Sequence, residues 1–70
     1  MNKLQVLTDN DIHWTIESYY GIGMTFFLGD KFNGVANYKS FYDFNEGVEW
    51  LWQEAKKKNP DNDCFAENRY

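Results

Sequence analysis

The chain has 70 residues, a net charge of −4 and an aromatic content of 20%, which describes one small domain whose core is built mainly from rings. That many large apolar groups exclude a disordered chain, and the lack of an unbroken apolar run of about 20 residues excludes a membrane-spanning one. The excess of carboxylates over Lys and Arg also argues against a surface made for phosphate backbones.

Residues 1–9 are the N-terminal segment. Leu4 and Val6 alternate with polar neighbours, so this segment is either a lead into the domain or a short extra strand. It carries no apolar stretch long enough for a signal peptide. Cys64 is the one cysteine, so no internal disulfide can form. Both features favour a cytoplasmic protein.

Residues 11–42 predict an antiparallel sheet. In the first strand, over Ile12–Tyr19, the residues Ile12, Trp14 and Ile16 alternate with polar side chains, as they do in a strand with one buried face. The connections between the predicted strands are too short for parallel crossovers, so we expect a meander.

Two turns divide this sheet. The run Gly21-Ile22-Gly23 predicts the first turn, before a second strand over Met24–Leu28. Asn33-Gly34 predicts the second turn, before a third strand over Val35–Phe41. The third strand leaves two facings open, with the inward set being either Val35, Asn37, Lys39 and Phe41 or Ala36, Tyr38, Ser40 and Tyr42.

An amphipathic helix is predicted over residues 43–59. Asp43 is a favourable N-cap, with Glu46 three residues later, and Pro60 follows the helix end. Gly47 either weakens this helix or permits close packing on the sheet. The apolar stripe expected to pack on the sheet, at helical spacing, is Phe44, Val48, Leu51 and Ala55.

The tail, residues 60–70, is expected to fold back through Phe65. The whole chain is therefore predicted to be a single α+β domain, residues 1–70. Its sheet is a small antiparallel three-stranded meander, with a fourth N-terminal strand as the alternative, and one C-terminal helix packs on one face.

No catalytic, cofactor or metal site is predicted. One His and one Cys cannot supply a zinc tetrad, and no local signature surrounds His13 or Cys64. The acidic triplets beginning at Asp9 and Asp61 lack the Gly and Glu that a calcium loop needs. Enzymatic activity is therefore the least favoured class.

Protein recognition is the class that remains, and the helix offers one candidate surface. On a helical projection Trp50 falls off the apolar stripe, close to Glu46 and Glu54, as an exposed interface anchor would. The alternative is that the tail covers Trp50 through Phe65 or Tyr70.

The sheet face away from the helix is the second candidate. By alternation it carries Glu17 and Tyr19, and one short helix cannot bury both faces of a sheet. The predicted partner-binding residues are therefore Glu17, Tyr19, Glu46, Trp50 and Glu54.

In size and composition alone, the chain resembles the small acidic proteins of bacteriophages and mobile elements. That resemblance implies a non-enzymatic protein-binding module, an inhibitor of the anti-CRISPR or other anti-defence type, that presents acidic and aromatic surface to a basic host protein. Two alternatives stay open: a sheet that binds single-stranded nucleic acid, which the charge disfavours, and a small structural homodimer. No membrane partner is expected.

Overall fold

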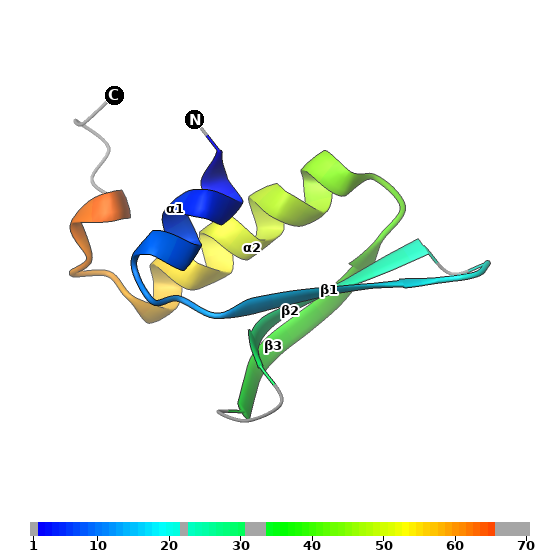
Figure 1. Ribbon diagram of the computed structural model, residues 1–70, viewed down its shortest axis with the longest axis horizontal. Helices are drawn as coiled ribbons and strands as arrows, with labels where there is room; N and C mark the ends of the chain where they lie inside the picture. The colour runs from blue at the N-terminus through cyan, green and yellow to red at the C-terminus, as the bar shows by residue number, and fades with distance from the viewer. Residues whose placement is uncertain (1, 22, 31–33, 66–70) are drawn as a thin grey trace.

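The computed structural model of the protein describes residues 2–21, 23–30 and 34–65. Its elements, in chain order, are helix α1 (Lys3–Asp9), strands β1 (Trp14–Tyr19), β2 (Gly23–Asp30) and β3 (Gly34–Phe41), helix α2 (Phe44–Lys58) and the 3₁₀ turn η1 (Asp63–Phe65). The strands form one antiparallel sheet in the order β1-β2-β3, and both helices lie on the same side of it (Figure 1). The expected α+β fold, with α2 packed on one face of a three-stranded meander, is confirmed.

The N-terminal segment contains a helix, Lys3–Asp9, that the sequence analysis did not predict, and the alternative of a short fourth strand there is wrong. The side chain of Asn2 accepts a hydrogen bond from the N–H of Gln5 and so caps α1. Leu4 and Leu7 then lie one turn apart, and Leu7 is fully buried where α1 packs on α2. The helix satisfies its main-chain groups locally, whereas a strand would have needed a sheet edge to pair with.

The start of α2 forms as predicted. Asp43 is the N-cap, and its Oδ2 accepts a hydrogen bond of 2.9 Å from the N–H of Glu46. The buried side of the helix, however, is rotated from the predicted stripe. Phe44 is 46% exposed and Trp52 is buried, because α1 and Phe65 add cover on the side where Trp52 lies.

Gly47 permits close packing of α2 on the sheet. A Cβ at this position would lie 2.0 Å from Cε1 of Phe26, the fully buried ring at the centre of β2. Of the two interpretations of this glycine, close packing is therefore confirmed. The buried apolar core comprises Leu7, Ile12, Phe26, Leu28, Leu51, Trp52, Ala55 and Phe65.

The register settles the facing of β3. Phe41 pairs with Met24, Lys39 with Phe26 and Asn37 with Leu28, so Asn37, Lys39 and Phe41 share the helix-covered side. The register shifts between Leu28 and Gly29, which places Val35 opposite Gly29 on the other side. Tyr38 and Ser40 lie on that other side as well. The first of the two inward sets left open by the sequence is therefore correct for Asn37, Lys39 and Phe41 and wrong for Val35.

The two turns lie partly outside the described residues. Gly21 and Gly23 both have a φ of +81°, which supports the turn predicted around them, although Ile22 is not among the described residues. Gly34 begins β3 with a φ of +94°, and Asn33 also lies outside the described residues. At the C-terminal end, Phe65 is buried, as expected of a residue that folds back onto the body.

Candidate interaction face

The far face is the side of the sheet that neither helix covers (Figure 1). Successive strand residues alternate between the two faces, and directly paired residues share a face. The described residues of the far face are therefore Thr15, Glu17 and Tyr19 on β1, Thr25 and Phe27 on β2, and Val35, Tyr38 and Ser40 on β3.

Rings dominate the exposed part of the far face. Tyr38 is 65% exposed, and its ring lies 5.8 Å from that of Phe27 on the neighbouring strand. Val35 and Tyr19 are 47% and 44% exposed. Tyr42, the residue after β3, is 81% exposed, and its Cδ1 lies 3.1 Å from where a Cβ of Gly23 would be. Four of the exposed large apolar residues thus belong to this side of the molecule or its border.

Hydroxyl groups of the far face form hydrogen bonds within it. The Oγ1 of Thr25 and the Oγ of Ser40 are 2.9 Å apart across β2 and β3. The hydroxyl of Tyr19 donates a hydrogen bond to the Glu17 carboxylate. Among the described residues of the far face, Glu17 is the one charged side chain. The described part of the far face can therefore offer apolar contact, tyrosine hydroxyls and one carboxylate, but neither Lys nor Arg.

The predicted residues on α2 lie on the opposite side of the molecule. Glu46, Trp50 and Glu54 follow one another every fourth residue, so they share one side of the helix. Trp50 is half-buried, with its ring 6.0 Å from that of Phe41 on the helix-covered side of the sheet. Trp50 therefore does not stand free in solvent.

Glu54 is already engaged within the chain. Its carboxylate accepts hydrogen bonds from Asn37 Nδ2 at 2.7 Å and from Lys57 Nζ at 3.0 Å. These bonds, that from Asn37 above all, hold the pKa of Glu54 below its ordinary value. Glu46 remains exposed near the start of α2.

The tail covers a different tryptophan from the one expected. The ring of Phe65 packs at 4.8 Å, edge to face, on Trp52, so the alternative in which Phe65 covers Trp50 is wrong. Tyr70 lies outside the described residues. The five predicted residues thus form two separate groups, with Glu17 and Tyr19 in contact on the far face and Glu46, Trp50 and Glu54 along α2.

The partner-binding residues predicted from the sequence did not include Val35, Tyr38 and Tyr42. Each side of the third strand carries both apolar and polar side chains in the sequence: Tyr38 and Tyr42 share one side with Ser40, and Phe41 shares the other with Asn37 and Lys39. The facing was therefore undecidable without the pairing partners on β2, and the register shift that turns Val35 outward has no clear sequence signal.

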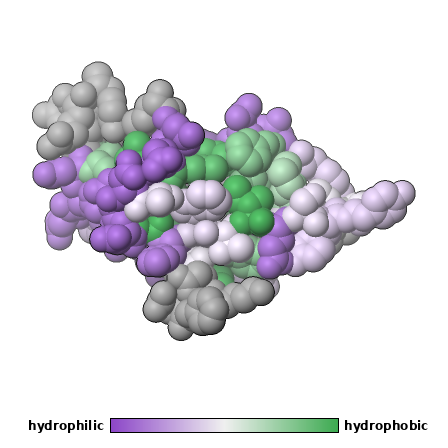
Figure 2. Space-filling model, viewed as in Figure 1, coloured by the Kyte–Doolittle hydropathy of each residue, from purple (hydrophilic) through white to green (hydrophobic). Residues whose placement is uncertain are grey.

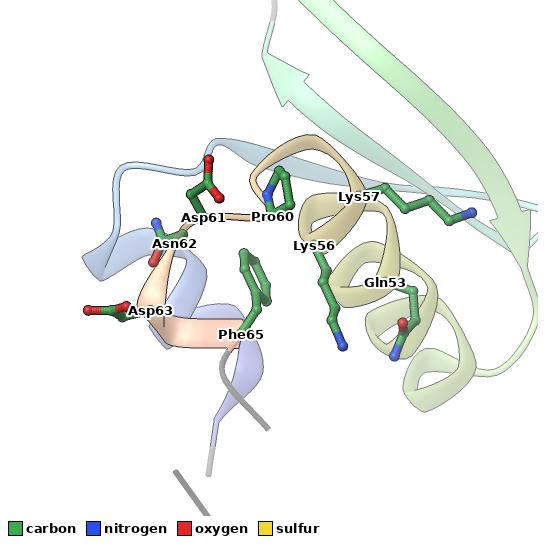
Figure 3. A pocket seen from close by; sticks show the side chains of 8 residues that line it. All are labelled: Gln53, Lys56, Lys57, Pro60, Asp61, Asn62, Asp63 and Phe65. Carbon is green, nitrogen blue, oxygen red and sulfur yellow. The ribbon is translucent and has the colours of Figure 1, made fainter. Parts of the chain in front are cut away.

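Two hollows on the helical side are alternative candidate sites. The first, about 450 Å³, lies beside the C-terminal end of α2, and Figure 3 shows the Phe65 ring pointing into it toward Pro60. Lysines and aspartates both line it, so its charge favours no ligand. Its lining residues are Gln53, Lys56, Lys57, Pro60, Asp61, Asn62, Asp63 and Phe65.

The second hollow, about 550 Å³, lies between the N-terminal ends of α1 and α2. Leu4, Phe44 and Val48 form its apolar part, and Lys3 pairs with Glu49 at its rim. Figure 2 shows apolar surface over the middle of the molecule, with polar surface toward the C-terminal end of α2 and paler surface toward the β1–β2 hairpin. Three of its polar lining residues are already engaged within the chain, since Asn2 caps α1 and Lys3 pairs with Glu49.

Within the described part of the chain, no three ligand-type side chains come together as a metal site. Burial raises the pKa of the Cys64 thiol, which lowers its reactivity as a nucleophile at neutral pH. Over the same residues, none of the helices is long and apolar enough to cross a bilayer.

No family model, curated protein or solved structure matches this chain. Its function is therefore inferred from its own residues.

Proposed function

We propose that this protein is a non-enzymatic protein-binding module that engages its partner through the far face. One observation carries the proposal: both helices cover the same side of the sheet, while the other side exposes Tyr19, Val35, Tyr38 and Tyr42 around the half-buried Phe27. Tyrosine supplies a large apolar area together with a polar tip, and it is enriched among the residues that dominate binding energy in protein interfaces.

The chemistry of the far face favours a protein over a nucleic acid. A phosphate backbone is bound by Lys and Arg, and the described far face holds neither. Lys39, the cation of β3, lies on the helix-covered side, 5.4 Å from the ring of Phe41. The partner that fits has an apolar patch for the rings and a donor or cation opposite Glu17.

A small inhibitor of phage origin that blocks a basic host protein is one form of such a module, and it is the form that size and composition favour. Its target would place a Lys or Arg against Glu17 and an apolar surface on Tyr38. The α2 group of Glu46 and Trp50 would then contribute to stability rather than to binding.

The test compares two tyrosines that are both exposed but lie in different places. Tyr38 is on the far face, whereas Tyr20 is fully exposed beside the β1–β2 turn. Immobilised wild-type protein is used to isolate a binding protein from an extract of the source cells, and the purified binding protein is then titrated calorimetrically with each variant. We expect Tyr38→Ser to weaken binding by about 2 kcal/mol or more, as at a central interface residue, and Tyr20→Ser to change it little.

Equal affinity of the wild type and Tyr38→Ser would reject the far face as the binding surface. Salt-dependent binding of single-stranded oligonucleotides, lost in Tyr38→Ser, would instead assign the face to nucleic acid. Melting curves of both variants serve as the folding control.

A further inference from the structure

The outer edge of β1 offers unpaired main-chain groups. Gly29 donates its N–H to the carbonyl of His13 at 2.8 Å, and the register places these two residues directly opposite each other. In an antiparallel pair, hydrogen-bonded positions recur at every second residue. Thr15, Glu17 and Tyr19 therefore bond to β2, and the N–H and C=O groups of Trp14, Ile16 and Ser18 point away from the sheet.

No partner for these outward groups occurs among the main-chain hydrogen bonds of the described residues. The β1 edge also lacks the features that usually block strand addition, since it has no proline, no lysine and no bulge. Glu17 is its one charged residue.

The opposite edge of the sheet, on β3, is partly occupied by a side chain. The same alternation directs the main-chain groups of Tyr38 and Ser40 outward. The outward N–H of Tyr38 donates to Oδ1 of Asn37 at 2.9 Å, and Nδ2 of Asn37 in turn donates to Glu54 on α2. The Asn37 amide is thus held in place by α2 while it occupies one of the two outward donors that an added strand would use.

We propose that a second copy of this chain pairs with the β1 edge, strand against strand and antiparallel, around a two-fold axis at Ile16. The axis places Ile16 opposite its symmetry mate, Trp14 opposite Ser18 and Thr15 opposite Glu17. This dimer uses main-chain groups of β1 and does not depend on what the far face binds.

Main-chain bonding and charge together select this register. With the axis at Ile16, the outward residues Trp14, Ile16 and Ser18 of both copies are all paired, which gives six main-chain hydrogen bonds. With the axis at Thr15, only Trp14 and Ile16 of each β1 are paired, which gives four. An axis at Glu17 sets the two carboxylates directly opposite each other, which is destabilising. With the axis at Ile16, each Glu17 faces a threonine.

The difference between the two edges favours a pair of copies over an open series. If both edges accepted strands, chains would add without limit and form fibres. On each copy the Asn37 amide occupies the Tyr38 donor of β3, whereas all three outward donors of β1 are open, so pairing through β1 is favoured over further addition at β3. The product is a six-stranded sheet with all helices on one side.

Sedimentation velocity of two matched proline variants tests the proposal. Ser18 and Ser40 are both exposed, and both have outward N–H groups, on β1 and β3 respectively. Proline at either position removes an edge donor without breaking a bond to β2. We expect a wild-type species of twice the 8.4 kDa chain mass at high micromolar concentration.

The two-fold axis repeats the substitution in both copies, so Ser18→Pro removes two hydrogen bonds from the dimer. It should therefore raise the dimer dissociation constant about tenfold or more. Ser40→Pro should leave it unchanged. A wild-type protein that stays monomeric at high concentration, or a Ser18→Pro protein that dimerises as well as Ser40→Pro, would overturn the proposal.

Cross-linking tests the register even if a proline variant does not fold. In a Cys64→Ser background, Thr15→Cys and Glu17→Cys proteins are each oxidised alone and as a mixture. Directly opposite residues at such positions have Cα atoms about 4.5 Å apart, within disulfide range. We expect a covalent dimer from the mixture and none from either protein alone. Cross-linking of Glu17→Cys alone, or no cross-link in the mixture, contradicts the pairing at Ile16.

Discussion

Replacing Gly47 by alanine tests the contact between α2 and the sheet. Helix propensity alone predicts that alanine stabilises an interior helical position by about 1 kcal/mol over glycine. The structure predicts the reverse, because the new Cβ would lie 2.0, 2.1 and 2.5 Å from three carbons of the Phe26 ring. Ordinary contact begins near 3.4 Å, so the ring or the helix must shift by about 1.4 Å.

Phe26 has little room for such a shift. It is fully buried, and its ring packs at 5.8 Å against Phe41 and at 6.0 Å against Phe44. Overpacking of a core costs about 1–3 kcal/mol and sometimes more. After the gain in propensity, Gly47→Ala should lose up to about 2 kcal/mol net, out of roughly 3–5 kcal/mol for a domain of this size.

Circular dichroism melting curves measure this effect. A loss of 1 kcal/mol lowers Tm by about 4–8 °C in a domain of this size. Asn45→Ala is the matched control, because Asn45 is exposed on the same helix and its replacement improves propensity without a clash. Adding Phe26→Leu to Gly47→Ala should cost less than the two single changes predict together. A Gly47→Ala protein that melts at or above the wild-type temperature would refute the close contact.

Three further outcomes are expected. Leu51→Ala removes a fully buried side chain, and urea unfolding should show a loss of about 2–5 kcal/mol; a change below 1 kcal/mol would place Leu51 outside the core. The Asn37 amide lowers the pKa of Glu54, so the Glu54 carboxylate stabilises the fold above its ordinary pKa and loses that contribution as the pH falls through the lowered value. Glu54→Gln should therefore flatten the decline of Tm below about pH 5. An unchanged pH profile of Tm would contradict this. Phe65→Ala should expose Trp52 and shift its fluorescence emission to the red, whereas an unshifted spectrum would show that the 3₁₀ turn does not cover that ring.

The elements with local signals were predictable from the sequence. Asp43 caps α2 through a bond to the residue three positions later, and the alternation of Trp14 and Ile16 defines the buried side of β1. Both depend on neighbours close in the chain. The two far-face residues Glu17 and Tyr19 follow from the same alternation.

The sequence around Asn2 contains a capping signal for helix α1. Asn2 and Gln5 have the spacing of a capping box, but Leu4 and Val6 also alternate as in a strand. A segment of seven helical residues is too short for periodicity to decide. Helix α1 is stabilised by packing on an apolar surface of α2, and the N-terminal sequence alone does not show that surface.

The exposure of Trp50 was misjudged for a related reason. Helical projection showed correctly that Trp50 lies off the centre of the stripe, but it assumed that one surface alone covers the helix. In the structure the sheet covers one side and α1 with Phe65 covers another, so Trp52 is buried and Trp50 reaches Phe41. Long-range cover of this kind depends on the whole fold.

The arrangement in two layers also separates the chromophores of the protein. Trp14 donates its indole N–H to Thr8 on α1, and the other two tryptophans belong to α2, so all three report on the helical layer. Tyr19 and Tyr38 lie on the bare side of the sheet. Light at the red edge of the absorption band excites tryptophan alone, whereas tyrosine responds at shorter wavelengths. In the unlabelled protein, loss of the helical packing and occupation of the sheet should therefore give two optical signals that can be recorded in the same cuvette.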